Sequence, residues 1–571
     1  MVKNILGLHV SGSQSGAAIL QDGKLIAAVS EERFNRQKRS RAFPHQAIKY
    51  CLESIGLSDL RDVDHVVMPW NPAIHMKNMN MSGFTQWRRY EPEWLYILPN
   101  NMMPYLEGEN IQYMQQGMAE RGGLFYYLSH HMAHMGWAYA SSFEECAIAV
   151  IDEHAESDAI SYGTLKGNKV DVLKSVPFPH SMGIYYATFT EYLGFQANGE
   201  EWKVMGAAAF GSPERFQDII RGLVRYEEGN VVIDQYCFTF SNMRVGGYFG
   251  EELIKYLGVP PRKPNEPLEQ IHYDFAAAVQ YIYEEILFSS LDWLAEETGM
   301  SNLVLAGGCA MNSLANGKII GNTNFKKLFV GPAAGDNGCA ISAALWLHAQ
   351  EKQDVPDPFR ASVSAYTGPS WNDDEIEKTL QRYKLHYKKS SNIVSDTVEC
   401  LINGKIVGWF HGALEFGERA LGARSILADP RDETMKDKIN LSVKYREAFR
   451  PFAPSILWEK VSQYFDIPDG ASADYMEQVY SIKEDKRSIV PAVVHNDGTG
   501  RLQTVKKETN LKYWQLISEF EKKTGVPLVL NTSFNVAGEP MVCSPDDAIR
   551  TFFTSGLDIL AIGTFIVQKD N

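Results

Sequence analysis

The first 60 residues alternate short apolar runs with polar turns, as paired strands followed by a helix do. Apolar residues fill 4–10 and 17–20, and a stretch rich in glycine and serine, 11–16, separates them. An Asp-Gly-Lys turn leads into the apolar run 25–29. Runs bounded by turn residues predict three strands joined by hairpins. Residues 45–56 have apolar side chains at helical spacing and predict an amphipathic helix.

The same order of elements returns further along the chain. The apolar run 146–152 is followed by alternating segments at 159–165 and 169–178 and by a helical pattern at 182–195. We therefore expect a second unit that repeats the first in outline. Residues 69–123 are rich in Met, Tyr, Trp and Pro and have weak periodicity, which favours an irregular helical insertion.

Two strand–glycine–helix patterns then follow one another closely. In the first, Gly307 and Gly308 come directly after an apolar strand, and Asn312 lies in the helical pattern beyond them. Backbone N–H groups at the start of a helix lack intrahelical partners and can bind anions. The repeated pattern therefore predicts a site for a nucleotide or an acyl phosphate.

A metal site is predicted by the spacing of His130 and His134. Residues four apart on a helix point in the same direction, so two imidazoles can converge on one divalent cation. Asp152 ends an apolar run and Asp336 follows a glycine-rich stretch, so both carboxylates are expected where strands give way to loops. Two imidazoles and two carboxylates without a thiolate suit Fe²⁺, Mn²⁺ or Zn²⁺.

Basic residues gather after a predicted domain boundary at 351–360, a polar stretch with two prolines. They are Arg419, Arg424, Arg431, Lys444, Arg446 and Arg450, and the polar residues Arg501, Asn531 and Ser533 follow. Arginine forks bind phosphate in bidentate fashion and lysine adds a compact charge, so the cluster predicts a polyphosphate pocket. Salt bridges on helix faces are the alternative. Two interpretations, an anion contact and a solvated surface, stay open for four basic residues nearer the N-terminus. They are Arg33, Arg36, Lys38 and Lys203.

Composition limits the classes of protein that these patterns can represent. The chain has 571 residues, of which 45% are hydrophobic and 22% charged, and a net charge of −15. No stretch approaches the roughly 20 apolar residues of a membrane span, and the N-terminus lacks the pattern of a signal peptide. We expect a multidomain cytoplasmic enzyme. Seven scattered cysteines favour reduced thiols, and the acidic charge disfavours broad binding of nucleic acid.

Several rare motifs, preserved in order, carry a family resemblance over nearly the whole chain. They are AAVSEERFNRQK, HHMAH, WKVMG, LAGGCAMN, GDNGCAISAAL, EFGERALGARSIL, VKYREAFRPFAPS and TGVPLVLNTSFN. Together they resemble the ATP-dependent carbamoyltransferases of the nodulation-factor and antibiotic-tailoring type.

The resemblance implies an α/β protein with two domains. Residues 1–352 would form a metal-binding carbamoyl-transfer domain of the actin/Hsp70/sugar-kinase superfold, like the tRNA threonylcarbamoyl-transfer protein. Residues 353–365 would be a linker. Residues 366–571 would form an α/β domain like threonylcarbamoyl-adenylate synthase, in which carbamoyl phosphate and ATP, with Mg²⁺, give carbamoyl adenylate. The acceptor would be a small molecule, here a natural product carbamoylated on a hydroxyl or amino group.

The family's functional residues are carried over by motif. The metal ligands would be His130, His134, Asp152 and Asp336, with Fe²⁺ as the favoured ion and Zn²⁺ or Mn²⁺ as alternatives. The residues expected to bind ATP and carbamoyl phosphate are Arg419, Lys444, Arg450, Arg501, Asn531, Ser533, Lys203, Gly307, Gly308 and Asn312, and catalytic roles are implied for Arg419, Lys444, Arg450 and Ser13.

Three departures bear on the transfer step. Where the family usually reads HDAS or HDSS, this chain reads Ser13-Gln14-Ser15-Gly16, and Ser13 replaces a histidine thought to stabilise an oxyanion. Where it reads DGxGE, this chain continues from Asp152 as Glu-His-Ala-Glu, so Glu153, His154 or Glu156 are candidate extra ligands. A proline of the family is Glu418 here.

Two other functions are considered. A sugar or acyl-phosphate kinase would share the N-terminal superfold but leaves the basic C-terminal cluster unexplained. A divergent member with a binding or regulatory role would account for the replaced histidine but not for the retained metal ligands. We expect a small-molecule partner, no nucleic-acid or membrane partner, and leave a homodimer open.

Overall fold

The computed structural model describes residues 3–10, 14–71, 124–239, 247–352, 357–445, 450 and 452–569. Most of the predicted insertion and part of the predicted linker lie outside these ranges, so both stay predictions.

The chain divides into two compact units. The N-terminal unit comprises Met1–Ala28, Arg41–Asn312 and Ile319–Val363, and the C-terminal unit comprises Val29–Ser40, Ser313–Lys318 and Ser364–Asn571. Two short segments from the first part of the chain therefore pack with the C-terminal unit. The functional domain limits expected at 352 and 366 stay a prediction, because compactness alone does not assign function.

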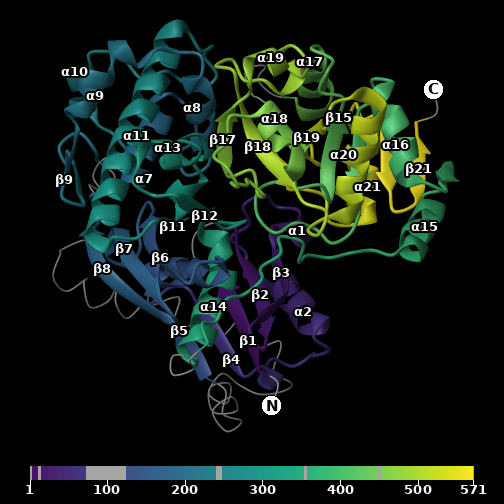
Figure 1. Cartoon of the computed structure of the whole chain (residues 1–571), viewed down its shortest axis with the longest axis horizontal. Coiled ribbons are helices and arrows are strands. Elements are labelled where there is room, and N and C mark those ends of the chain that lie inside the picture. The colour runs from purple at the N-terminus through teal and green to yellow at the C-terminus, as the bar shows by residue number, and fades with distance from the viewer. Residues whose placement is uncertain are drawn as a thin grey trace. The chain divides into compact units, whose positions relative to one another are not determined.

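Two five-stranded sheets form the centre of the N-terminal unit (Figure 1). The first has the order β3-β2-β1-β4-β5, with β1 (Asn4–His9), β2 (Gly16–Gln21), β3 (Lys24–Ser30), β4 (His65–Met68) and β5 (Leu124–Tyr127). The second has the order β8-β7-β6-β11-β12, with β6 (Glu145–Ile151), β7 (Asp158–Lys166), β8 (Lys169–Pro177), β11 (Asn302–Ala306) and β12 (Lys327–Val330).

The two sheets share one topology. In each, the first strand pairs antiparallel with the second and parallel with the fourth, as β1 does with β2 and β4, and β6 with β7 and β11. The predicted hairpin between β2 and β3 forms through Asp22 and Gly23, whose φ values of 50° and 80° suit a type I′ turn. The predicted α/β class and repeated architecture are therefore confirmed.

Close packing of α14 (Cys339–Gln350) depends on two glycines. A Cβ atom on Gly7 of β1 would lie 1.8 Å from the carbonyl oxygen of Ala340. A Cβ atom on Gly136, directly after α6 (His130–Met135), would lie 2.0 Å from the carbonyl oxygen of Ser342. Helix α14 therefore packs directly on β1 and α6, and its first residues lie near the two histidines of α6.

Further helices complete the N-terminal unit. They are α2 (His45–Ser54), α7 (Met182–Tyr192), α8 (Glu201–Ala208), α9 (Gln217–Arg221), α10 (Glu251–Leu257), α11 (Gln270–Thr298) and α13 (Ile319–Asn322), with a hairpin of β9 (Val224–Glu227) and β10 (Asn230–Ile233). The long helix α11 contacts α7, α8 and β6, so it lies close to the second sheet.

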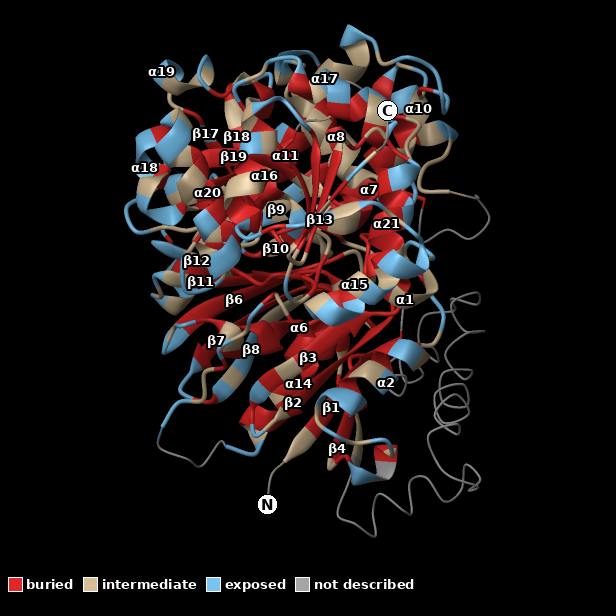
Figure 2. Ribbon diagram, turned by 90° about the vertical axis from the view of Figure 1, so that its right-hand side faces the viewer, coloured by how far each residue is buried: buried red, intermediate tan, exposed pale blue. Residues whose placement is uncertain are grey.

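One nine-stranded mixed sheet forms the C-terminal unit. Its order is β13-β21-β20-β14-β15-β19-β16-β18-β17, with β13 (Tyr387–Lys389), β14 (Val407–Phe410), β15 (Arg424–Ala428), β16 (Ala453–Leu457), β17 (Gln478–Ser481), β18 (Thr499–Val505), β19 (Leu528–Ser533), β20 (Ile559–Ile562) and β21 (Phe565–Gln568). Its helices are α1 (Glu32–Asn35), α12 (Ser313–Asn316), α15 (Asp373–Arg382), α16 (Ile393–Ile402), α17 (Met435–Ile439), α18 (Val461–Tyr464), α19 (Glu484–Arg487), α20 (Leu511–Thr524) and α21 (Pro545–Phe553). Buried residues run along its strands (Figure 2), and most of their apolar side chains belong to one large core cluster.

Segment 29–40 is held in the C-terminal unit by arginines. The guanidinium of Arg33 donates to the carbonyl oxygen of Gly417 at 2.8 Å, and Arg36 donates to the carbonyl oxygens of Pro540 and Met541 at 2.8 and 2.5 Å. Arg33 is 5% exposed. For these two residues the structure supports neither a solvated surface nor a free anion contact, because their guanidinium groups contact backbone carbonyl oxygens and the carboxylates of Glu32 and Asp547.

Among the described residues, no helix is both long and apolar enough to cross a membrane. All seven cysteines are free thiols.

Candidate metal centre and anion site

The two histidines of α6 converge as their spacing predicts. Their Nε2 atoms lie 3.2 Å apart, and both side chains are buried. Ligand nitrogens about 2.0–2.1 Å from a tetrahedral ion lie roughly 3.3 Å apart. The separation therefore fits two ligands of one ion.

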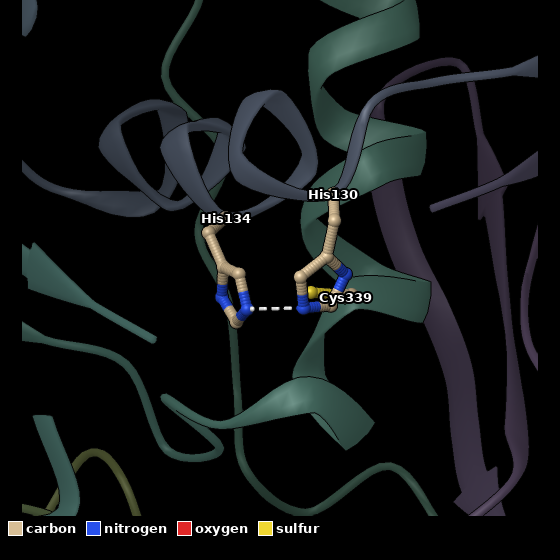
Figure 3. A group of neighbouring side chains, drawn as sticks. All are labelled: His130, His134 and Cys339. Atoms are coloured by element: carbon tan, nitrogen blue, oxygen red, sulfur yellow. Dashed lines mark hydrogen bonds between the residues drawn. The ribbon is translucent and has the colours of Figure 1, made fainter. Parts of the chain in front are cut away.

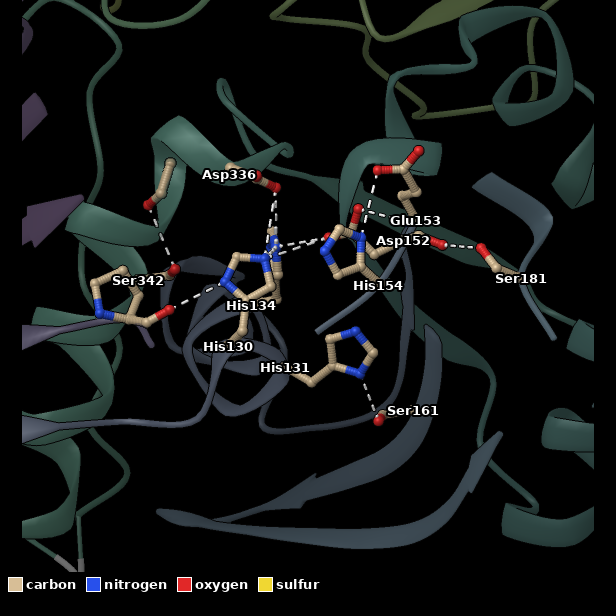
Figure 4. A network of polar contacts seen from close by, with 12 residues as sticks. His130, His131, His134, Asp152, Glu153, His154, Ser161, Ser181, Asp336 and Ser342 are labelled. Atoms are coloured by element: carbon tan, nitrogen blue, oxygen red, sulfur yellow. Dashed lines mark hydrogen bonds and ion pairs between the residues drawn. The ribbon is translucent and has the colours of Figure 1, made fainter. Parts of the chain in front are cut away.

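Two carboxylates complete the group (Figure 4). The Oδ2 atom of Asp152 lies 3.1 Å from Nε2 of His134 and 3.5 Å from Nε2 of His130. The Oδ1 atom of Asp336 lies 3.5 Å from Nε2 of His130 and 3.8 Å from Nε2 of His134. All four ligand atoms lie within 4.8 Å of one another.

The fold explains why these four residues meet. Asp152 directly follows β6 and Asp336 lies in the loop after β12, and these two strands flank β11 in a parallel arrangement. His130 begins α6 shortly after β5 of the first sheet. Side chains at the carboxyl ends of parallel strands share one edge of a sheet, which is where α/β proteins bind ligands. The centre thus lies at the carboxyl ends of strands from both sheets.

Surrounding groups orient the histidines. Nδ1 of His130 lies 3.0 Å from the carbonyl oxygen of Pro69, and donation there leaves Nε2 as the lone-pair atom. The carboxylate of Glu156 accepts from the backbone N–H of His130 at 3.0 Å and from that of Asn71 at 2.6 Å. Glu156 therefore caps α6 and is not available as an extra ligand.

Burial and charge act on these groups in opposite directions. Burial lowers the pKa of His130 and His134, but Cys339 and the carboxylates of Asp152 and Asp336 raise it well above its usual value overall. Burial raises the pKa of Asp152 and of Asp336, and the charge of Asp336 adds to the rise for Asp152. Hydrogen bonding to the imidazoles outweighs these effects, so the pKa of each carboxyl group lies below its usual value. In the absence of a metal the cluster is therefore held by ion pairing.

The residues fit a divalent metal. Oδ2 of Asp152 is buried and has no well-directed hydrogen-bond donor among the described residues, although two imidazole nitrogens face it. A cation shared by these atoms would satisfy all of them.

Neighbouring candidates have other partners. Glu153 accepts from the hydroxyl of Tyr248 at 2.7 Å and from Asn198 at 3.3 Å. His154 lies 3.4 Å from Glu153. In the part of the chain that the structure describes, neither residue belongs to a group of converging ligand atoms. Sequence reasoning missed Cys339, whose sulfur does belong to one, with His130 and His134.

The glycines predicted to bind a nucleotide line the metal centre. Gly307 has a φ of 94°, and a Cβ atom there would lie 2.3 Å from the carbonyl oxygen of Ile151. A Cβ atom on Gly308 would lie 3.0 Å from Oδ1 of Asp152. Both glycines therefore let the chain after β11 pass close to the end of β6.

Two other predicted contacts have protein partners. Asn312 exchanges two hydrogen bonds with Gln280, at 3.0 and 3.2 Å. Lys203 forms an ion pair with Glu200 at 2.8 Å. Ser13, the predicted catalytic residue of the N-terminal loop, lies outside the described residues.

In the C-terminal unit, Arg419 is an unpaired cation in a fixed loop. Its half-buried guanidinium has no hydrogen bond or ion pair among the described residues, and burial lowers its pKa despite the neighbouring carboxylate of Glu418. The surrounding backbone is held on both sides. Arg33 donates to the carbonyl oxygen of Gly417, and Asn531 donates to that of Ala420 at 3.0 Å.

Lys444 and Ser533 lie together. The ammonium of Lys444 donates to the carbonyl oxygen of Ser533 at 2.5 Å and to the carbonyl and side-chain oxygens of Asn535 at 2.9 and 2.8 Å. These acceptors are neutral oxygen atoms. Asn531 instead lies in a buried network with Ser455 and Gln503, both about 3 Å away.

Other cations gather in the same unit. Burial lowers the pKa of Lys38, and the charges of Arg39 and Arg450 lower it further. Burial lowers the pKa of His495, and the charge of Arg501 lowers it further. Like charges at short range are typical of a site that binds an anion.

Two arginines of the predicted phosphate pocket are structural. Arg424 is fully buried, donates to the carbonyl oxygens of Pro369 and Gly412 at 3.0 Å, and stacks on Phe410. Arg431 pairs with Asp429 at 2.6 Å.

Comparison with known proteins identifies the family of the chain. The family model of the carbamoyltransferase N-terminus matches residues 4–345, and that of the carbamoyltransferase C-terminus matches residues 398–569. The chain belongs to the carbamoyltransferase family. An uncharacterised protein of Synechocystis sp. is 35% identical over 99% of this chain and 97% of its own length.

Other relatives are named as nodulation proteins. The nodulation protein NolNO of Sinorhizobium fredii is 36% identical over 99% of this chain and 81% of its own length. The nodulation protein NolO of Bradyrhizobium diazoefficiens is 38% identical over 77% of this chain and 79% of its own length. Among solved structures, HypF of T. kodakarensis matches with a TM-score of 0.33 and 10% identity, covering 62% of this chain and 48% of that one.

Proposed function

We propose that this carbamoyltransferase activates carbamoyl phosphate with ATP and Mg²⁺, and transfers the carbamoyl group to a hydroxyl or amino group of a small natural product. In the first step, carbamoyl phosphate takes up water and loses phosphate, and the resulting carbamate oxygen bonds to the α-phosphorus of ATP and displaces pyrophosphate. In the second step, the acceptor atom attacks the carbamoyl carbon, loses its proton to solvent, and AMP leaves.

Arg419 is the observation that carries the first step. Among the described residues the half-buried guanidinium has no hydrogen bond or ion pair, and its burial outweighs the nearby charge of Glu418, so it is costly unless an anion joins it. Phosphate oxygens accept bidentate hydrogen bonds from such a fork. The cations around Lys38 and the ammonium of Lys444 add positive charge in the same unit. A polyphosphate substrate would supply the missing negative charge.

The N-terminal unit would carry the second step. His130, His134, Asp152 and Asp336 would hold Fe²⁺, with Zn²⁺ or Mn²⁺ as alternatives. A bound divalent ion supplies Lewis-acid stabilisation of negative charge. Gly308 leaves no side chain beside Oδ1 of Asp152, where a Cβ atom would lie 3.0 Å away.

The acceptor is proposed to be a small molecule. A net charge of −15 repels the phosphate backbone of nucleic acids and anionic membrane surfaces, which leaves small acceptors as the favoured class. A homodimer is compatible with this proposal.

The products formed from ATP and carbamoyl phosphate test the first step. The full-length protein should release pyrophosphate, whereas a kinase would release ADP. Arg419→Ala should lower carbamoyl-phosphate-dependent ATP–pyrophosphate exchange by at least 100-fold, the scale of losing one charged donor to a phosphoryl group. Arg382→Ala is the control, because Arg382 pairs with Asp546 on the surface of the same unit. Equal exchange in both variants would contradict the proposed site.

A further inference from the structure

Cys339 lies where a protein ligand of a metal ion would lie. It is the first residue of α14, is completely buried, and has its Sγ within 4.8 Å of ligand nitrogens of both His130 and His134. Figure 3 shows the sulfur beside the ring of His130, with the ring of His134 turned toward the same place. Two imidazoles and a thiol therefore form a second group of converging ligand atoms.

The two groups overlap but do not merge. His130 and His134 lie in both, but the sulfur and the two carboxylate oxygens do not all come within 4.8 Å of one another. Metal–nitrogen and metal–oxygen bonds of about 2.0–2.2 Å and metal–sulfur bonds of about 2.3 Å place two ligand atoms of one ion no more than roughly 4.5 Å apart. One ion therefore cannot take all five ligands without movement of a side chain.

The ligand atoms of the two groups prefer different metals. Carboxylate oxygens suit hard ions such as Mn²⁺, whereas thiolate suits Zn²⁺, Co²⁺ and Cd²⁺, and imidazole serves both classes. The position of the Cys339 sulfur beside His130 and His134 therefore offers a thiophilic ion a ligand that the carboxylate group lacks.

We propose that the centre has two alternative ligand sets that share His130 and His134: hard ions use Asp152 and Asp336, and thiophilic ions use Cys339. This inference rests on the proposed metal centre. Binding of a thiophilic ion forms a metal–sulfur bond, and the thiol proton passes to solvent. Occupancy of the centre would then depend on which metal is supplied, and a thiophilic ion would leave the carboxylates without their cation.

Cobalt and manganese distinguish the two sets in the full-length protein. Metal-free protein is titrated with Co²⁺, and thiolate coordination is read from the sulfur-to-cobalt charge-transfer absorption in the near ultraviolet. Mn²⁺ binding is followed by the loss of the free-ion electron paramagnetic resonance signal. Cys339→Ala and Cys339→Ser should abolish the cobalt band and leave the Mn²⁺ affinity within about threefold. Asp336→Asn should keep the cobalt band and weaken Mn²⁺ binding by at least about 10–100-fold, which is the loss that follows removal of even an outer-shell partner.

Cys309→Ser is the matched control, because Cys309 lies in the loop after β11 but belongs to neither group among the described residues. It should keep both signals. Binding of Co²⁺ without a charge-transfer band would overturn the thiolate set while leaving the metal centre intact, and Cys339 would then be a small buried packing residue. Failure of the wild-type protein to bind either ion would overturn the inference and the metal centre together.

Discussion

Replacement of Arg33 by methionine tests how strongly segment 29–40 is held in the C-terminal unit. Arg33 forms an ion pair with Glu32 at 2.8 Å, and both side chains are only 6% exposed. The same guanidinium donates to the carbonyl oxygen of Gly417 at 2.8 Å. Arg33→Met keeps much of the side-chain volume but leaves the carboxylate of Glu32 buried without its cation. Glu32 would retain the backbone N–H of Arg39, at 2.6 Å, as a donor.

The expected cost follows from these contacts. A hydrogen bond from a charged group is worth about 1.5–3 kcal/mol, and breaking a buried ion pair by removing one partner costs about 3–5 kcal/mol. The two terms describe the same guanidinium and overlap, so we expect Arg33→Met to lower the free energy of unfolding of the C-terminal unit by about 3–5 kcal/mol. The control is Arg382→Met. Arg382 and its partner Asp546 are 62% and 42% exposed, so their pair should be worth less than about 1 kcal/mol.

Urea unfolding of the full-length chain, followed by tryptophan fluorescence, measures both changes from the shift in midpoint and the slope. The double variant Glu32→Gln/Arg33→Met should recover at least about 1 kcal/mol relative to Arg33→Met, because it removes the unpaired buried carboxylate. ATP–pyrophosphate exchange should also fall in Arg33→Met, because Gly417 lies two residues before Arg419. This reasoning would be refuted if Arg33→Met lowered the free energy of unfolding no more than Arg382→Met does. It would also be refuted if the double variant recovered no stability.

Three further predictions concern the metal, the packing of α14 and pH. Elemental analysis should find roughly one divalent ion per chain in the wild-type protein, as expected for such a site, and none in His134→Ala. The control variant His131→Ala should keep the ion, because His131 lies on the same helix but bonds to Ser161. Gly7→Ala should cost about 1–3 kcal/mol by overpacking, while Gly321→Ala, with no atom within 4 Å of the added Cβ, should cost nothing measurable in thermal unfolding. Burial raises the pKa of Glu477 to about 8, so its contribution to stability is complete below its unfolded pKa, near 4.3, and is lost as pH rises through 8. Glu477→Gln should therefore flatten the fall in melting temperature between about pH 5 and 8, and an unchanged profile would contradict this.

Local patterns were sufficient to predict many of the described elements and the convergence of the proposed metal ligands. The hairpin at Asp22 and Gly23 follows from turn chemistry, and the convergence of His130 and His134 follows from helical periodicity. The close approach of Asp152 followed from its position at the end of an apolar run, because a strand end in a parallel arrangement faces one edge of the sheet.

Contacts that depend on tertiary packing were out of reach. Cys339 has no pattern that distinguishes a ligand from a packing thiol, and only the approach of α14 to α6 brings its sulfur to the histidines. Arg424 and Arg419 occur in one motif and have the same side chain. The first is buried among carbonyl oxygens, whereas the second has no partner among the described residues, and sequence spacing does not separate these environments.

Asn531 shows how a binding site can depend on residues that need not touch the ligand. The sequence predicts a nucleotide contact, but the amide of Asn531 donates to Ser455, Gln503 and the carbonyl oxygen of Ala420. An unpaired guanidinium on a mobile loop would move toward water or a carboxylate, because both lower its free energy. Since hydrogen bonds fix the backbone on either side of Arg419, the cation stays half-buried. In the proposed phosphate site, the binding energy of the phosphate would then not be spent on ordering the loop, which is the physical advantage of a preorganised site.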